Sequence, residues 1–378
     1  MNDERPSKTA ENRGATRREF VKASVAGAVG LTLGYQASRA DADAPKPQLL
    51  APYNARTVSA MPTRNLGKTG YRVGIFGLGG QATIEKPNME DQSVAIVNRA
   101  LDLGVNYIDT AAAYGGQDQW SQKYIGTVMK HRRREVFLAS KTHRRSYDES
   151  MRLLETSLKQ LETDHLDLWQ LHDISTTEQL DQIFAKDGAI RALERARSEK
   201  VVRFLGITGH ADPFVLADGL KRYRFDTILM ALNAADRHHL SFIEHLLPLA
   251  LEQELGIIGM KIAARGRLLS FWTPPPPATP TMASEAKRLL KKLLLYETSR
   301  LETQREQRGK LTMKEAMEYV LSLPVSTVVI GCDNLEQLEE NVRIAREFTP
   351  LSEQKLSTLT TRTEEIRRQA LYFRKWQA

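Results

Sequence analysis

The chain has 378 residues and only one cysteine, Cys332, so it forms no internal disulfide bond and holds no cysteine-based zinc site. It contains no uninterrupted apolar run of the roughly 20 residues that a membrane-spanning helix needs. Its first strand-like segment is not followed by the G-x-G-x-x-G helix start that marks a doubly wound dinucleotide-binding sheet. These absences argue against a disulfide-rich module, a membrane span and a Rossmann-type domain.

The chain also lacks a concentrated charge of one sign. Its net charge is +8, but the basic residues are dispersed, and the densest clusters, 131–134 and 287–292, lie beside segments with helical spacing. No DNA- or RNA-binding motif accompanies them, so we expect a solvated surface and no nucleic-acid partner. A hydrophobic fraction of 41% and a charged fraction of 26% are typical of a globular protein with a sizeable core.

The first 45 residues are predicted to precede the folded part as a twin-arginine signal peptide and linker. The pair Arg17-Arg18 is followed by an apolar run, 23–35, that is too short to span a membrane, and 38–40 has the small–x–small pattern of a cleavage site. Weak hydrophobicity together with the double arginine favours the twin-arginine export machinery over the general pathway. We therefore expect an exported, periplasmic protein that is processed near Ala40 or Ala42. The alternative is a chance amphipathic N-terminal tail.

From residue 60 onward, short apolar segments alternate with segments of helical spacing. A hairpin is expected first, at 64–73, with its turn at Gly67 to Gly70. The eight expected strands are 73–78, 105–109, 136–139, 166–171, 202–207, 227–232, 256–260 and 327–330. The expected helices are 91–103, 118–130, 148–162, 188–199, 212–221, 241–254, 312–322 and one that begins at residue 335. Because the strands lack polar alternation, both of their faces are expected to be buried, as in a parallel sheet.

Eight such units predict a (β/α)8 TIM barrel, an α/β fold, over residues 60–350. An N-terminal hairpin precedes the barrel, and a C-terminal helical extension, 351–378, follows it. A long insertion, 265–310, comes after the seventh strand and contains a rigid proline run at 274–277 and a basic helical segment at 284–307. An insertion at that position is expected to lie over the mouth of the active site. It can be interpreted either as a lid or as a solvated surface helix.

Four polar residues stand at or near the ends of consecutive expected strands. Asp109, Lys141 and His172 end the second, third and fourth strands, and Tyr114 lies on the loop after the second. Barrel enzymes place their catalytic groups at this face, and neighbouring strands are only about 4.8 Å apart. The four side chains are therefore expected to converge on one point.

These residue types suit proton donation to a carbonyl group. A phenol has a pKa of about 10 and donates poorly at neutral pH until its phenolate is stabilised, which an adjacent ammonium does. Asp109 is expected to keep Lys141 charged and directed at Tyr114. His172 is expected to hydrogen-bond the phenol oxygen or to relay its proton. A carbonyl bound between Tyr114 and His172 would be polarised at oxygen and protonated there.

The chain resembles an aldo-keto reductase over nearly all of residues 62–350. The matching segments, in order and at the family's spacing, are Leu66-Gly67-Lys68-Thr69-Gly70, Gly104 to Gly115, Ala139-Ser140-Lys141-Thr142, Leu168-Trp169-Gln170-Leu171-His172, Gly206-Ile207-Thr208-Gly209-His210, Ala231-Leu232-Asn233, Val329-Ile330-Gly331 and Glu336 to Asn341. The resemblance implies a (β/α)8 barrel that uses NAD(P)H without a Rossmann domain, which agrees with the missing glycine fingerprint. It also implies that the four residues above form the family's catalytic tetrad.

The resemblance further implies where the cofactor binds. The nicotinamide is expected at the ends of the fifth to seventh strands, and the pyrophosphate on the following loop, where Lys261 and Arg265 supply positive charge. Leu229 stands where the family commonly has a glutamine, and Asn233 is the nearest polar substitute. Met260 stands where the family commonly has a stacking aromatic ring. The adenosine end is expected at the start of the last barrel helix, a place that favours anionic groups. The full predicted set is Gly79, Gly80, Asp109, Thr208, His210, Asn233, Met260, Lys261, Arg265, Gly331, Cys332, Gln337, Glu340 and Asn341.

The choice of nucleotide depends on two of these positions. Many members of the family read the 2′-phosphate of NADP with a lysine and an arginine, and this chain has Gly331 and Gln337 there. The family also contains NADP-dependent members with this pattern, so NADP is the expected cofactor and NAD is the alternative. Arg265 or Arg267 would then supply the missing positive charge.

The predicted function is that of an exported oxidoreductase that reduces an aldehyde or ketone to an alcohol by hydride transfer, with Tyr114 as the general acid. A nucleotide-sensing or regulatory barrel with vestigial activity is the alternative, because the expected nicotinamide contacts are substituted. A metal-dependent barrel hydrolase is disfavoured and no metal site is expected, since His238, His239 and His245 have no companion carboxylates at ligand spacing. A small-molecule carbonyl substrate and a monomeric state are expected, the latter because the sequence has no heptad seam.

Overall fold

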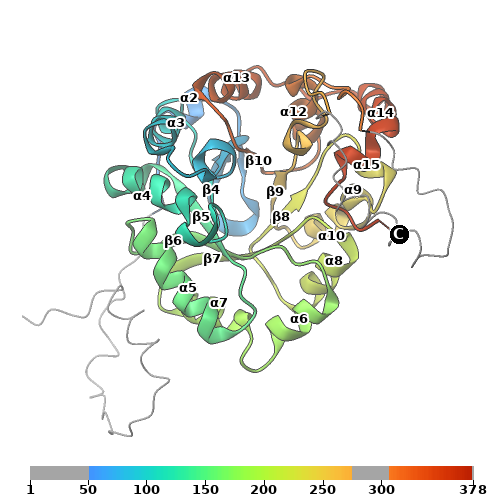
Figure 1. Ribbon diagram of the computed structural model, residues 1–378. Helices are drawn as coiled ribbons and strands as arrows, with labels where there is room; N and C mark the ends of the chain where they lie inside the picture. The colour runs from blue at the N-terminus through green and yellow to red at the C-terminus, as the bar shows by residue number, and fades with distance from the viewer. Residues whose placement is uncertain (1–50, 275–305, 377–378) are drawn as a thin grey trace, which may run out of the picture.

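Eight parallel strands close into a barrel at the centre of the computed structural model, which describes residues 51–274 and 306–376 (Figure 1). The strands are β3 (Phe76–Gly79), β4 (Tyr107–Asp109), β5 (Phe137–Thr142), β6 (Leu166–Leu171), β7 (Val202–Gly209), β8 (Thr227–Ala231), β9 (Gly256–Met260) and β10 (Thr327–Ile330). Because β10 pairs with both β3 and β9, the sheet has no free edge. The predicted (β/α)8 TIM barrel is confirmed.

Helices form a ring around the barrel (Figure 1). Those that follow the strands are α3 (Glu90–Asp102), α4 (Trp120–Arg132), α5 (Tyr147–Gln160), α6 (Thr177–Phe184), α7 (Ala189–Ser198), α8 (Pro213–Arg222), α9 (Phe242–His245), α10 (Leu247–Glu252), α12 (Met313–Leu321) and α13 (Leu335–Arg346). A short helix, α2 (Thr57–Ala60), precedes the barrel, and α14 (Glu353–Arg362) and α15 (Arg367–Ala370) follow it.

Two helical segments differ from the sequence expectation. Helix α6 was not expected, and it begins with a capping box between Thr176 and Gln179. The single helix expected at 241–254 was wrong, because the chain forms α9 and α10 with a break at Leu246. Pro248 lies in the first turn of α10, where its missing N–H costs no hydrogen bond, whereas inside a continuous helix it would remove one. The helix expected at 284–307 lies almost wholly outside the described residues.

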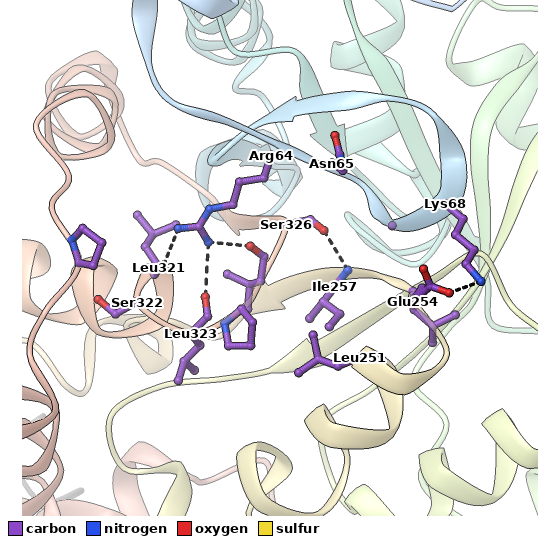
Figure 2. A pocket seen from close by; sticks show the side chains of 15 residues that line it. Arg64, Asn65, Lys68, Leu251, Glu254, Ile257, Leu321, Ser322, Leu323 and Ser326 are labelled. Carbon is purple, nitrogen blue, oxygen red and sulfur yellow. Dashed lines mark hydrogen bonds and ion pairs between the residues drawn. The ribbon is translucent and has the colours of Figure 1, made fainter.

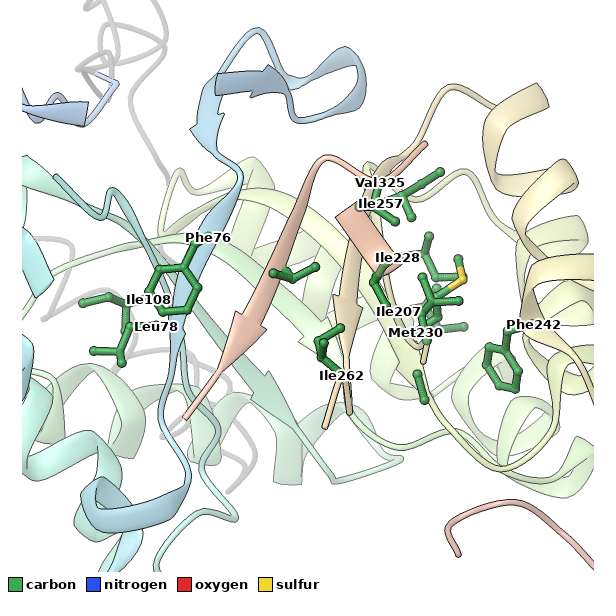
Figure 3. Packing of buried hydrophobic residues seen from close by; sticks show 14 of the residues in the cluster. Phe76, Leu78, Ile108, Ile207, Ile228, Met230, Phe242, Ile257, Ile262 and Val325 are labelled. Atoms are coloured by element: carbon green, nitrogen blue, oxygen red, sulfur yellow. The ribbon is translucent and has the colours of Figure 1, made fainter. Parts of the chain in front are cut away.

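Alternate residues of each strand face two separate apolar clusters. Outward side chains join the large cluster between strands and helices, and Figure 3 shows Ile207, Ile228 and Met230 gathered on the side of the barrel toward α9. Inward side chains fill the barrel, where the rings of Tyr107 and Phe137 stack with their centroids 5.6 Å apart. Both faces of the strands are therefore buried, which explains why the strand segments show no polar alternation.

The predicted N-terminal hairpin closes the floor of the barrel. Its strands are β1 (Thr63–Asn65) and β2 (Arg72–Gly74), and they pair antiparallel. Leu66, Tyr71 and Val73 are buried in the inner cluster. Gly67 has a φ of +54°, and a Cβ there would lie 2.2 Å from the backbone nitrogen of Gly256, so this contact with β9 requires glycine.

A recess of about 590 Å³ lies between the hairpin and the N-terminal ends of β9 and β10 (Figure 2). The guanidinium of Arg64 crosses it and donates to the carbonyl oxygens of Leu321, the last residue of α12, and of Val325 in the turn before β10. The recess is at the opposite end of the barrel from Asp109 and His172, because those residues stand at the C-terminal ends of their strands. It therefore has no part in the site described next.

Candidate active site

The C-terminal ends of β4, β5 and β6 bring the four predicted catalytic residues together. Asp109 is the last residue of β4, Lys141 lies one residue from the end of β5, and His172 follows β6 directly. Tyr114 lies on the loop after β4, with its hydroxyl oxygen 3.4 Å from Nζ of Lys141. The rings of Tyr114 and His172 meet edge to face at a centroid distance of 5.7 Å. The convergence expected from the strand ends is thus present.

Lys141 has three acceptors for its three N–H groups. Its ammonium pairs with Oδ2 of Asp109, donates to the carbonyl oxygen of Thr110 at 2.8 Å and reaches the hydroxyl of Tyr114. The side chain is buried. Burial lowers the pKa of Lys141, and the negative charge of Asp109 opposes that shift. The carboxylate therefore holds the ammonium in place and directs it at the phenol.

The loop that carries Tyr114 turns away immediately after it. Gly115 and Gly116 both have positive φ, at +85° and +66°, and a Cβ on Gly115 would lie 2.5 Å from the backbone nitrogen of Trp120. Burial raises the pKa of Tyr114 well above its usual value, and the charges of Asp109 and Glu85 add to the rise. The phenol is therefore protonated and available as a donor.

His172 is neutral in this environment. Burial lowers its pKa well below the usual value, and the charge of Lys141 lowers it further. A neutral imidazole beside a protonated phenol is suited to hydrogen bonding with a carbonyl oxygen rather than to carrying a charge.

Thr208 and His210, which belong to the predicted cofactor-binding set, are tied to the loop after β6. Oγ1 of Thr208 accepts a hydrogen bond of 2.9 Å from the backbone nitrogen of Asp173. Nε2 of His210 lies 3.2 Å from Oδ1 of Asp173. Burial lowers the pKa of His210, although Asp173 opposes the shift. Thr208 is buried, and no acceptor for its hydroxyl hydrogen is found among the described residues.

Asn233 joins two loops by means of its side chain. Its amide nitrogen donates to the carbonyl oxygens of Lys261 and Ala370, and its amide oxygen accepts from the backbone of Ala235. The side chain is fully buried. In this arrangement Asn233 shapes the ends of β8 and β9, and its polar atoms are directed at the protein itself.

The C-terminal segment 367–376 lies beside the ends of β7 and β8. Arg374 is buried, forms an ion pair with Asp236, and donates to the carbonyl oxygens of His210 and Ala231. Its guanidinium also lies 3.8 Å from the ring centroid of Phe242 in α9, and Figure 1 shows the end of the chain on that side. Sequence reasoning missed this contact, because no local pattern joins residues so far apart.

The loop after β9 presents two cations. Lys261 and Arg265 both have positive φ, at +62° and +54°. Neither has an ion-pair partner among residues 51–274 and 306–376. Burial and the nearby charge of Arg265 lower the pKa of Lys261 to about 8. Two adjacent unpaired cations fit the negative charge of a pyrophosphate. Met260, which precedes them, is half-buried against both apolar clusters.

The residues predicted at the adenosine end divide into buried and exposed ones. Cys332 and Asn341 are buried and bound to each other, with Nδ2 of Asn341 3.4 Å from Sγ. Gln337 is exposed and accepts from the backbone nitrogen of Asp333, and Glu340 is paired with Arg343. Only the exposed members of this set present side chains to a ligand.

The three predicted glycines meet at the ends of β3 and β10. A Cβ on Gly79 would lie 2.9 Å from the backbone nitrogen of Gly331. The backbone nitrogen of Gly80 donates to the carbonyl oxygen of Asp109 at 2.7 Å. These glycines allow the backbones to approach one another beside the tetrad.

Cys332 is expected to be unreactive in the folded protein. Burial raises the pKa of its thiol to about 12, so almost none of it is thiolate at neutral pH. A thiol-specific reagent should label native protein slowly and label unfolded protein at once. Rapid labelling of the native protein would show that the thiol is accessible.

Within the described ranges, no group of three or more His, Cys, Asp or Glu residues is arranged to hold a metal ion. A helix with the length and apolar character of a membrane span is likewise not found in that part of the chain.

The fold and the site together define a (β/α)8 barrel oxidoreductase with a Tyr–Lys–Asp–His centre. Comparisons with known proteins agree. The model of the Aldo/keto reductase family matches residues 73–363. L-galactose dehydrogenase of Arabidopsis thaliana is 31% identical over 304 residues, which cover 76% of this chain and 89% of that protein. The chain therefore belongs to the aldo/keto reductase family.

Two further relatives cover even more of the chain. An uncharacterized oxidoreductase, YqkF, of Bacillus subtilis (strain 168) is 27% identical over 326 residues, which are 81% of this chain and 97% of that protein. The holo form of aldo-keto reductase AKR11C1 from Bacillus halodurans matches with a TM-score of 0.61 and 27% identity over 80% of this chain and 96% of that one. The protein is an NAD(P)-dependent oxidoreductase that reduces carbonyl groups. The regulatory barrel is not favoured.

Proposed function

We propose that Tyr114 is the general acid of this carbonyl reductase. The observation that supports this role is the contact of 3.4 Å between its hydroxyl and Nζ of Lys141, whose other two donors are tied to Asp109 and Thr110. An ammonium held at that distance stabilises the phenolate that remains after the proton is given up. A substitution of Tyr114, described in the Discussion, tests the role.

The remaining residues of the tetrad support this proton transfer. Asp109 holds Lys141, and neutral His172 donates a hydrogen bond to the carbonyl oxygen and so orients the substrate. The nicotinamide cofactor supplies the hydride when it is bound. Lys261 would hold its pyrophosphate, and the hydroxyl of Thr208 would donate to its amide. Because the tetrad is buried, water is excluded from the site of proton transfer.

Carbonyl reduction is expected to be independent of pH from about pH 7 to about pH 9, because the raised pKa keeps Tyr114 protonated across that range. Alcohol oxidation needs the phenolate as a base, so its rate should rise with pH over the same interval. Values of kcat measured in both directions check this. A kcat for reduction that falls through neutral pH would contradict the assignment.

NADP remains the proposed nucleotide. The support is the sequence pattern at Gly331 and Gln337 and the presence of Arg265 and Arg267 on the loop after β9. Arg267 is already paired with Glu306, which leaves Arg265 as the better candidate for the 2′-phosphate. Values of kcat/KM with NADPH and NADH decide between the two, and a large preference for NADH would overturn the proposal.

Export through the twin-arginine machinery to the periplasm also remains a proposal. It rests on Arg17-Arg18 and the short apolar run after them, which lie outside the described residues. Fractionation of the native host, followed by N-terminal sequencing, tests it. Exported protein that still begins at Met1 would contradict processing near Ala40 or Ala42.

The substrate class that we propose to test first is a hydroxylated aldehyde or its cyclic form. The support is the likeness to L-galactose dehydrogenase over most of both chains. L-Galactose should be assayed in the oxidative direction beside unhydroxylated aldehydes in the reductive direction. A clear preference for the unhydroxylated compounds would remove this class.

A further inference from the structure

A different partner holds each oxygen of the Asp109 carboxylate. Oδ2 pairs with the ammonium of Lys141, and Oδ1 accepts a hydrogen bond of 3.1 Å from Nε2 of Gln170. Gln170 lies on β6 in register with Lys141 on β5, and it is fully buried inside the barrel. Two neighbouring strands therefore hold this carboxylate from two sides.

The second hydrogen bond fixes the plane of the carboxylate. With Lys141 as its one partner, the group could rotate about its Cβ–Cγ bond and carry the ammonium with it. The bond from Gln170 prevents that rotation, and a hydrogen bond to an ionised group is among the stronger ones in proteins. The contact between Lys141 and Tyr114 is the longest of the three that the ammonium makes, so it is the first to be lost if Asp109 turns.

We propose that Gln170 is a positioning residue of the reaction, which holds Asp109 and, through it, keeps Lys141 directed at Tyr114. Gln170 acts through these two side chains and not on the substrate. The proposal rests on the function proposed above, in which Tyr114 is the general acid.

A glycine leaves room for the side chain of Gln170, and the carboxylate of Asp109 sets the orientation of its amide. Gly206 on β7 is its neighbour in register, and a Cβ there would lie 3.0 Å from Cγ of Gln170 and 2.5 Å from Oγ1 of Thr227. Glycine thus leaves the space that the glutamine occupies. The reverse orientation of the amide would place Oε1 against the carboxylate, where two acceptors repel. Nε2 therefore faces Asp109.

Gln170→Met tests the proposal, because methionine has a similar shape and no donor. It is expected to lower kcat by about tenfold to a hundredfold, as loss of a hydrogen bond to an ionised group or of an outer partner of a functional residue does. KM for the carbonyl compound and the Kd for cofactor, followed by nicotinamide fluorescence, should change little.

Gln122→Met is a matched control. Gln122 is also fully buried, and its Nε2 donates one hydrogen bond, of 2.7 Å, to Oγ of Ser140. In both glutamines the amide oxygen has no partner among the described residues. The control should lose a similar amount of thermal stability while keeping kcat near the wild-type value. Equal losses of kcat in the two variants would overturn the proposal.

Gln170→Glu adds a second measurement, the pH dependence of kcat, which would not change if Gln170 had a purely structural role. A carboxyl group beside Asp109 has a raised pKa, and in its protonated form it donates to Oδ1 as the amide does. The kcat of this variant is expected to approach the wild-type value at acidic pH and to fall as pH rises. A kcat that is far below the wild-type value at every pH would overturn the proposal.

Tyr114→Phe, measured in parallel, separates the two hypotheses. If it loses activity while Gln170→Met behaves like the control, the positioning role is wrong and the proposed function stands. If Tyr114→Phe keeps wild-type activity, the proposed function fails, and the positioning role fails with it.

Discussion

Replacing Tyr114 by phenylalanine is expected to lower kcat for carbonyl reduction by about a hundredfold to ten-thousandfold, the range that a positioned general acid contributes. Phenylalanine keeps the ring and its edge contact with His172 but has no proton to give. Affinity for the cofactor should change little, because Lys141 keeps its bonds to Asp109 and Thr110. Steady-state kinetics and fluorescence titration measure the two quantities.

Tyr124→Phe is the matched control for this experiment. Tyr124 lies on α4, is also largely buried, and donates its hydroxyl to the carbonyl oxygen of Lys86 at 3.3 Å. The variant loses this hydrogen bond and the one that the hydroxyl accepts from the backbone nitrogen of Met89. Both are neutral and lie away from the tetrad, so its kcat should stay near the wild-type value. A folded Tyr114→Phe variant as active as this control would show that another group delivers the proton.

Replacing Arg374 by methionine is expected to destabilise the fold by about 3–5 kcal/mol, the cost of removing one partner of a buried ion pair. Asp236 would keep its bonds from Ser241 and Ile243 but lose its cation. Burial lowers the pKa of Arg374 to about 10 and raises that of Asp236, so both charges depend on each other. Urea unfolding measures the loss.

Two controls make this result specific. Arg343→Met removes exposed ion pairs with Glu340 and Glu347 and should leave the unfolding midpoint close to that of the wild type. Asp236→Asn combined with Arg374→Met removes both charges and should recover part of the stability. A double variant as unstable as the sum of its two single variants would show that the pair is not coupled.

Local sequence patterns were enough to predict the barrel and the convergence of the tetrad. Strands that are buried on both faces are recognised in the sequence as short apolar runs, and parallel strands bring their C-terminal ends to one face of the barrel. Asp109, Lys141 and His172 could therefore be placed together without any knowledge of a distant contact. The hairpin was predictable for a similar reason, because its turn residues stand next to each other.

Contacts between distant segments could not be predicted in this way. Gln170 stood inside a recognised motif, and the alternation along β6 places it on the same inner face as Leu168, yet nothing local shows that it reaches Asp109. Asn233 was expected at the nicotinamide because of its place in the chain, while its partners are Lys261 and Ala370. Each of these bonds depends on tertiary packing, which periodicity does not encode.

The contact between the C-terminal segment and the barrel has a consequence for truncated forms of the protein. Arg374 follows all eight barrel strands in the sequence, and β10 must pair with β3 before the sheet loses its open edges. A chain truncated before β10 would expose unpaired strand edges, and one truncated before Arg374 would leave Asp236 buried without its cation. Residues 367–376, which follow the last helix of the barrel, therefore contribute to the packing of the barrel itself.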